Sequence, residues 1–91
     1  MKSSNFNKYK VAVIGCGYWG SIITNTLLKI KIKKIYIYDQ NYKNTLILKK
    51  KYKNLIITKS YKDLLNDKTI PFFFFATPPS VNFKIVSKAI I

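Results

Sequence analysis

The three glycines of the sequence are the residues whose spacing first suggests a chemistry. Gly15, Gly17 and Gly20 are the only glycines in the chain, and they form the pattern G-x-G-x-x-G. Such a loop brings backbone N–H groups close to a phosphate, because glycine has no Cβ to hold the ligand away. We expect Gly15 to allow a tight turn, Gly17 to admit a pyrophosphate, and Gly20 to let a helix pack closely on a strand.

Asp39 is the second chemical feature, because it follows the last glycine by 19 residues and ends an apolar run. An acid at this distance accepts hydrogen bonds from the adenosine ribose in dinucleotide-binding folds. Its charge would repel a 2′-phosphate, which carries roughly −1.5 to −2, so we expect NAD rather than NADP. Lys34 and Lys43 lie close enough in sequence to weaken that preference. Two simpler alternatives stay open: an ordinary strand-to-helix turn at the glycines, and a solvated acid at a strand end.

The segments around these residues alternate between strand and helix patterns. Strands are predicted where short runs are apolar and rich in β-branched or aromatic side chains, at residues 11–14, 35–38, 55–58 and 71–76. A helix is predicted after the glycines because apolar positions recur at helical spacing, at Trp19, Ile22, Ile23, Thr26, Leu27 and Ile30.

Further helices are predicted over residues 42–52, after Ser60 and over residues 81–91. Ser60 stands three residues before Asp63, which is close to a capping box. The alternation predicts an α/β fold with a Rossmann-type parallel sheet in the order 3-2-1-4, incomplete after the fourth strand and the following helix.

Composition removes several classes of function. The chain has one Cys and three acids, all Asp, and it contains no His, Glu or Arg. A zinc site, a disulfide framework and a Ser-His or Cys-His nucleophile pair all lack their parts. Three acids also make hydrolysis by a pair of carboxylates unfavourable as a hypothesis. We therefore assign no catalytic residue and no metal ligand.

The net charge of +14 supports a competing hypothesis, a small basic nucleic-acid-binding module. Arg, the usual bidentate reader of guanine, is absent, and the lysines are scattered over most of the chain. We therefore expect no specific nucleic acid partner. The densest group, at Lys49, Lys50, Lys51 and Lys53, is expected to be a solvated helix face.

Residues 11–28 carry no formal charge, which raises the question of a membrane span or a signal peptide. Polar side chains and glycines dilute this stretch too much for a span. Only four apolar residues precede Cys16, whereas a signal core has about 7 to 15. We expect a cytoplasmic protein with no membrane partner, and the single Cys fits a reducing compartment.

These motifs together resemble the N-terminal domain of the Gfo/Idh/MocA oxidoreductases, over about Lys10 to Ile91. Residues 11–20, VAVIGCGYWG, are similar to the opening of that family, and residues 60–67, SYKDLLND, match its third-helix segment. The most specific match is ATPPS at residues 76–80, which resembles the loop that lines the cofactor after the fourth strand. The Tyr-Trp pair is frequent among members acting on sugars or nucleotide-linked sugars.

The resemblance implies an NAD(P)-binding domain of an oxidoreductase acting on a sugar, a nucleotide sugar or a polyol. The implied cofactor contacts are Gly15, Gly17, Tyr18, Trp19, Gly20, Asp39, Ala76, Thr77 and Pro78. We expect Trp19 mainly to pack the helix, with only its backbone N–H meeting phosphate. Asn82 stands where the family commonly has His. A methyltransferase, whose related fold also has a glycine loop and a second-strand acid, is disfavoured by the double-proline loop.

The same resemblance divides the chain into a flexible N-terminus, residues 1–9, and a C-terminally truncated dinucleotide-binding domain, residues 10–91. The family's fifth strand with its Glu-Lys-Pro motif and its substrate domain are not present, so we expect cofactor binding without catalysis. A folded remnant without function stays open as an alternative. Truncation would leave residues 72–75 as an unpaired strand edge, which predicts self-association.

Overall fold

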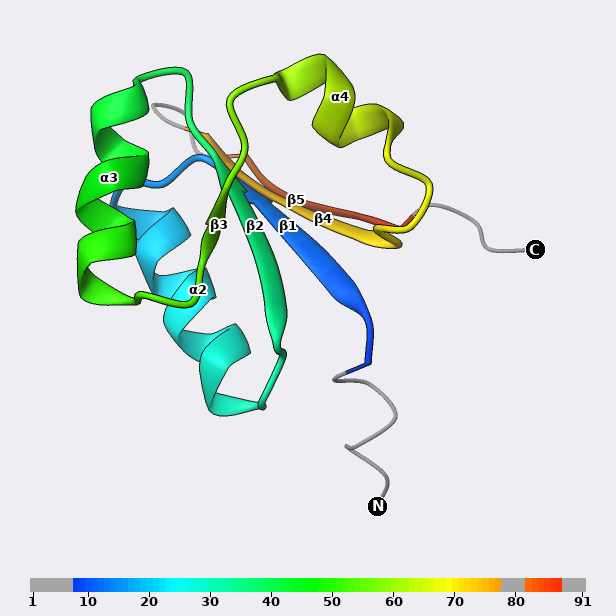
Figure 1. Ribbon diagram of the computed structural model, residues 1–91, viewed down its shortest axis with the longest axis horizontal. Coiled ribbons are helices and arrows are strands. Elements are labelled where there is room, and N and C mark those ends of the chain that lie inside the picture. Colours follow the sequence, from blue (N-terminus) through cyan, green and yellow to red (C-terminus); the bar gives the residue numbers. More distant parts are fainter. Residues whose placement is uncertain (1–7, 78–81, 88–91) are drawn as a thin grey trace.

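Five strands and three helices are formed by residues 8–77 and 82–87, the part of the chain that the computed structural model describes (Figure 1). The strands are β1 (Lys10–Ile14), β2 (Lys34–Tyr38), β3 (Ile56–Ile57), β4 (Phe72–Thr77) and β5 (Asn82–Ser87). The helices are α2 (Tyr18–Lys29), α3 (Tyr42–Lys51) and α4 (Tyr61–Asn66). The sheet has the order β3-β2-β1-β4-β5, and its first four strands are parallel. The predicted Rossmann-type order 3-2-1-4 is therefore confirmed.

The sheet buries a different set of side chains on each face. On the face covered by α2 and α3, Val13 and Ile37 pack with Leu27 and Leu48. On the opposite face, Ala12, Ile14 and Phe73 pack with Leu64 of α4. Because β1 is the central strand of the sheet and has helices on both faces, it is buried throughout from Val11 to Ile14.

The buried side of α2 differs from the prediction. The buried residues are Gly20, Ile23, Thr24 and Leu27. By contrast Trp19, Ile22 and Ile30 are 49%, 40% and 42% exposed. The reason is a backbone contact, since a Cβ at Gly20 would lie 1.7 Å from the carbonyl oxygen of Gly15. This contact fixes the rotation of the helix about its axis, and the apolar periodicity alone does not reveal it.

Capping side chains start two of the helices. The Ser60 hydroxyl accepts a hydrogen bond from the Asp63 N–H at 3.1 Å, which confirms the cap predicted there. The Asn41 side chain accepts from the Lys43 N–H at 3.1 Å at the start of α3. Helix α2 differs, because Gly17 is its N-cap and no side chain caps it. Its first N–H groups are therefore left for another acceptor.

A lysine ends α2 where glycine is the usual residue. The N–H of Ile32 bonds to the carbonyl oxygen of Leu27 at 3.1 Å, and the N–H of Lys31 bonds to that of Leu28 at 3.0 Å. These two bonds form a Schellman motif, whose central residue adopts the left-handed conformation. Lys31 accordingly has a φ of 71°. The turn into β2 thus holds a side chain in a conformation that favours glycine.

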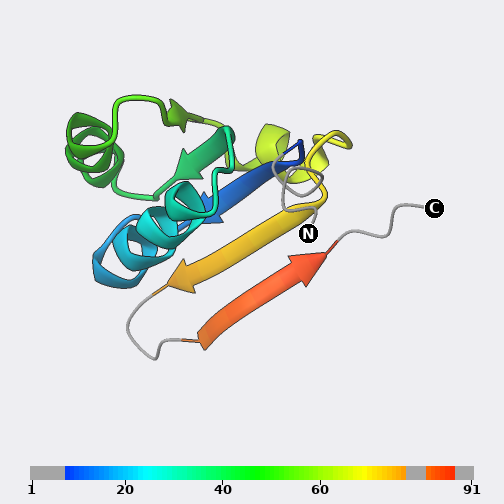
Figure 2. The same cartoon turned by 90° about the horizontal axis from the view of Figure 1, so that it is seen from below.

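After β4 the chain forms a strand where a helix was predicted. Strand β5 pairs antiparallel with β4 along its full length, from Phe72 with Ser87 to Thr77 with Asn82 (Figure 2). The predicted helix over residues 81–91 is therefore wrong for residues 82–87, and the rest of it lies outside the described residues. The edge of β4 offers a row of backbone donors and acceptors, and the β-branched and aromatic residues that follow suit a strand. The edge at residues 72–75, expected to stay unpaired, is covered by β5.

None of the helices in residues 8–77 has the length and apolar content that crossing a membrane requires.

Candidate functional site

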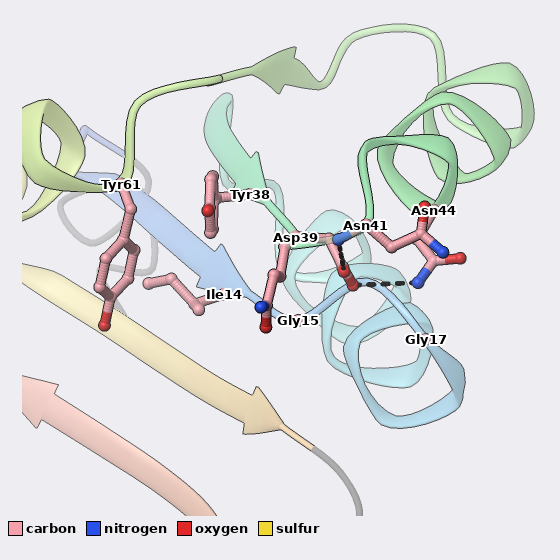
Figure 3. Close-up of a pocket in the computed structure, with 9 residues that line it drawn as sticks. Ile14, Gly15, Gly17, Tyr38, Asp39, Asn41, Asn44 and Tyr61 are labelled. Carbon is pink, nitrogen blue, oxygen red and sulfur yellow. Dashed lines mark hydrogen bonds between the residues drawn. The ribbon is translucent and has the colours of Figure 1, made fainter.

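A cleft of about 650 Å³ lies at the carboxyl ends of β1 and β2 (Figure 3). The residues that line it are Ile14, Gly15, Gly17, Tyr38, Asp39, Gln40, Asn41, Asn44 and Tyr61. Its volume falls within the range of about 300 to 1,000 Å³ that is usual for small-molecule sites. Open parallel sheets bind their ligands at this end, where the connections leave the strands. Two of the predicted glycines and Asp39 therefore share one cleft.

The three glycines of the loop have three different environments. Gly15 has a φ of 99°, a conformation that other residues rarely adopt. Gly20 lies against the backbone of Gly15, so a side chain there would collide with it. Gly17 has neither constraint, because its φ is −77° and a Cβ on it would have no atom within 4 Å. Turn geometry and packing explain two glycines, and the third leaves open space in the cleft.

The start of α2 adds an electrostatic feature beside Gly17. The first turn of this helix of 12 residues contains no acid and has no capping side chain. The uncapped N–H groups and the helix dipole give such an end a partial positive charge. An anion placed over Gly17 would accept hydrogen bonds from this end, as phosphates do in other glycine-rich loops.

The carboxylate of Asp39 points toward the glycine loop. Its Oδ2 accepts hydrogen bonds from the Cys16 N–H at 2.7 Å and from Nδ2 of Asn44 at 3.2 Å. Its Oδ1 accepts from the Asn41 N–H at 2.7 Å, and the bonds to Asn41 and Asn44 are drawn in Figure 3. Each carboxylate oxygen has two lone pairs, so Oδ1 keeps one for a hydroxyl of a ligand. Asp39 thus positions the glycine loop and can still accept a hydrogen bond from a ligand.

Cys16, between the first two glycines, is buried and does not act as a nucleophile. Burial raises the pKa of its thiol to about 12, with a further contribution from the negative charge of Asp39. The thiol hydrogen-bonds to the carbonyl oxygen of Tyr38 at 3.6 Å. A thiol with this pKa stays protonated at neutral pH. Its place in the loop is therefore structural.

Aromatic side chains form the end of the cleft away from Gly17. The rings of Tyr38 and Tyr61 are 5.2 Å apart between centroids and inclined by 31°. Ile14 lies between Tyr61 and the loop, and Asp39 lies between Tyr38 and Gly17 (Figure 3). The cleft consequently runs from an aromatic end, past a carboxylate, to a bare backbone turn.

The two aromatic residues of the loop lie outside this cleft. Tyr18 and Trp19 are 74% and 49% exposed, and their rings meet edge to face at 5.3 Å. The expectation that Trp19 packs the helix is therefore wrong, because the Gly20 contact turns it outward. Tyr18 lines a smaller groove of about 330 Å³ between α2 and α3, together with Ile47 and Lys51.

The residues predicted after the fourth strand are only partly described. Ala76 is buried in the core between the sheet and α2, and it does not line the cleft. Thr77 ends β4 and pairs with Asn82, while its side chain lies outside the described part. Pro78 falls outside the described residues.

The two lysines expected to weaken the preference for NAD are separated by the structure. Lys34 begins β2, five residues before Asp39, which places it roughly 16 Å from the cleft at the usual rise of a strand. Its predicted influence is therefore wrong. Lys43 is exposed in the first turn of α3. Lys59 also lies near this end, in a groove of about 260 Å³ that includes Asp39.

Sequence reasoning missed the residues that support Asp39. Asn41 and Asn44 contact its carboxylate, and Tyr38 and Tyr61 line the cleft. A signal was present for the asparagines, since a strand-ending acid can accept from the backbone N–H two residues later and from a side chain five residues later at a helix start. No comparable signal existed for Tyr61, which comes from a distant segment.

Comparisons of this chain with models of protein families, with curated proteins and with solved structures found no match. Among residues 8–76 no group of three metal-ligating side chains is gathered at the cleft or elsewhere.

Proposed function

We propose that the cleft binds NAD, and that the chain is the cofactor-binding part of a Gfo/Idh/MocA-like oxidoreductase acting on a sugar, a nucleotide sugar or a polyol. The observation that carries the proposal is the open space at Gly17. A Cβ at this position would meet no protein atom within 4 Å, so packing does not require glycine there, whereas the approach of a diphosphate to the backbone does.

The order of chemical groups along the cleft supports the same ligand. The aromatic end at Tyr38 and Tyr61 suits the adenine base, the free lone pair of Asp39 suits a ribose hydroxyl, and the uncapped start of α2 suits the diphosphate. Adenosine diphosphate carries its base, ribose and diphosphate in the same order. A simple phosphate ion would use only the last of them.

Preference for NAD over NADP follows from the position of Asp39. A 2′-phosphate would lie against a carboxylate that three internal donors hold in place, so the carboxylate cannot easily turn away. Lys59 and Lys43 stay as nearby cations that reduce this repulsion. We therefore propose a preference for NAD rather than complete exclusion of NADP.

Binding without turnover is proposed for these residues alone. Bound NAD would supply a hydride acceptor, and the reaction then needs a group that takes the substrate proton. The chain contains no His or Glu, and the carboxylate of Asp39 is occupied by the loop. The described cleft thus positions a cofactor and offers no His or Glu to a substrate.

Calorimetric titration of the folded chain with NAD and with NADP tests the proposal. We expect saturable heat with NAD, weaker binding of NADP, and a graded loss of affinity in Gly17→Ala and Gly17→Val as the added side chain fills the space. The Cβ at residue 17 meets no protein atom, so both variants should keep the thermal stability of the parent chain.

Trp19 gives an independent readout, because it is the only Trp and lies half exposed next to the loop. Energy transfer from Trp19 to bound NADH should appear in the parent chain and disappear in Gly17→Val. Absence of heat and of transfer with the folded parent chain would refute the proposal. Equal binding by Gly17→Val would refute the assignment of the phosphate to the loop.

A further inference from the structure

The lysines are concentrated at the end of the sheet opposite the cleft, which we call the amino edge. Eleven of the fourteen lysines among residues 8–76 lie at the strand starts, in the last helical turns, or in the connections leading into β2, β3 and β4. The other three, Lys43, Lys59 and Lys62, lie near the cleft together with Asp39 and Asp63. Parallel strands begin at one edge, so the fold brings these separate lysines together (Figure 1).

The helix dipole explains only part of this concentration. Lysines in the last turns of α2 and α3 are favoured by the negative helix ends. Lys10 and Lys34 are not in helices, and they are direct partners in the pairing of β1 with β2. Like charges at paired positions of a sheet are unfavourable, and here the Lys10 ammonium bonds to Thr69 Oγ1 at 3.1 Å and lies over the ring of Tyr36.

The turn between α2 and β2 adds a further unfavourable lysine. Lys31 takes the left-handed position of the Schellman motif, where glycine would relieve strain. The turn exposes Lys31, Lys33 and Lys34 while it buries Ile32. Its surface therefore presents ammonium groups at the expense of local stability.

Acidic side chains are few beside this charge. Lys10 and Lys49 are hydrogen-bonded to neutral oxygens. Asp67, the one acid on this side, accepts hydrogen bonds from the backbone N–H and the hydroxyl of Thr69. Lysines outnumber acids eleven to one on this side among residues 8–76, so the amino edge carries a net positive charge.

We propose that the amino edge binds nucleic acid through its phosphates, without reading the base sequence. Lysines that neutralise phosphates release condensed counterions, which supplies the affinity. The chain has no Arg for bidentate base contacts, so sequence independence follows. An acidic membrane is the other large polyanion, but lipid surfaces are usually bound by an exposed apolar helix face, and the turn at Lys31 offers only Ile30, 42% exposed, while it buries Ile32. This surface is separate from the proposed cofactor cleft.

Two triple variants of equal charge test the location of binding. The first is Lys31→Gln with Lys33→Gln and Lys34→Gln at the amino edge, and the second is Lys43→Gln with Lys59→Gln and Lys62→Gln near the cleft. All six side chains are exposed, so both proteins should fold, which circular dichroism checks. The probe is a fluorescently labelled 20-nucleotide single-stranded DNA of mixed sequence, followed by anisotropy at several salt concentrations.

We expect the amino-edge triple to bind at least tenfold more weakly than the parent chain at low salt. Its slope of log affinity against log salt should fall by about 2, since each lost phosphate contact on a single strand contributes roughly 0.7. The triple near the cleft should change affinity less than threefold. Replacing the same amino-edge lysines with Arg should keep binding, and Gly17→Val should leave it unchanged.

Equal weakening by both triples would overturn the proposal, because net charge rather than the amino edge would then govern binding. Absence of binding to the labelled DNA at low salt would overturn it as well. Binding to phosphatidylserine vesicles that depends on the amino-edge lysines, without binding to DNA, would replace nucleic acid with a lipid surface as the partner.

Discussion

The two ends of the parallel sheet differ in what their side chains do. At the carboxyl end, Asp39 is held by donors from the glycine loop and the start of α3, and its geometry is fixed by short hydrogen bonds. At the amino edge, most of the lysines among residues 8–76 are exposed, and two of them are neighbours across β1 and β2. Specific hydrogen bonds define the carboxyl end, whereas the amino edge is defined by lysine side chains that the fold brings together.

This difference indicates how each end can tolerate change. A site held by a few short contacts loses its geometry when one contact is removed. A surface that acts through the sum of exposed charges loses its effect gradually, with little cost in stability. Four predictions test this contrast, and the largest effects are expected at the glycine loop.

Gly20→Ala should produce the largest loss of stability. Its Cβ would lie 1.7 Å from the carbonyl oxygen of Gly15, so the backbone of α2 or of the loop must move. We expect a loss of about 3 kcal/mol or more, at or above the usual cost of overpacking, measured by urea unfolding. Gly17→Ala is the matched control and should change stability by less than about 0.5 kcal/mol. A Gly20→Ala variant as stable as this control would contradict the contact.

Asp39→Ala should destabilise the carboxyl end by about 2 kcal/mol, because it leaves the Cys16 N–H and the Asn41 N–H without their acceptor. Asn44→Ala removes only the longest of the three bonds and should cost about 1 kcal/mol or less. Unfolding in urea compares the two variants. If both lose the same stability, the carboxylate does not hold the loop as the structure indicates.

Stability should decline in alkaline solution through Cys16. Burial raises the pKa of its thiol from 9.0 to about 12, so between these values the unfolded chain loses a proton that the folded chain keeps. The contribution of the thiol is complete below pH 9 and is lost as the pH rises toward 12. Tyr and Lys also titrate in this range, so the measurement is the difference between the parent chain and Cys16→Ala in thermal unfolding. A difference that does not change with pH would contradict the burial of the thiol.

Lys31→Gly should have the smallest effect, and it should be stabilising. Glycine removes the strain of the left-handed φ at the end of α2, and it also removes one charge from the amino edge. We expect a gain of about 0.5 to 1 kcal/mol in thermal unfolding. Lys33→Gly, two residues away in the same turn, is the control and should give no gain.

Much of the carboxyl end could be predicted from the sequence because its signals are local. The glycine spacing requires a strand, a turn and a helix in succession, and Asp39 follows the second strand at the expected distance. Alternation of strands and helices then favours parallel pairing. The Ser60 cap was predictable for the same reason, since its partner is three residues away.

The parts that could not be predicted depend on contacts distant in sequence. Trp19 is exposed because Gly20 lies close to Gly15, and this contact rotates α2 so that part of its apolar face points to solvent. Residues 82–87 form a strand because the edge of β4 is available to them, and local propensity allowed either structure. Tyr61 lines the cleft only because β3 and β2 are neighbours in the sheet.

The reversal of direction between β4 and β5 has a practical consequence. Ser87 pairs with Phe72 at the start of β4, and Lys8 precedes the start of β1, so the described chain enters and leaves the sheet on the same side (Figure 2). A fusion partner or a surface attachment at either of these points would sit far from Asp39. Immobilised protein would then present its cleft to solution, while a bulky partner would shield the lysines.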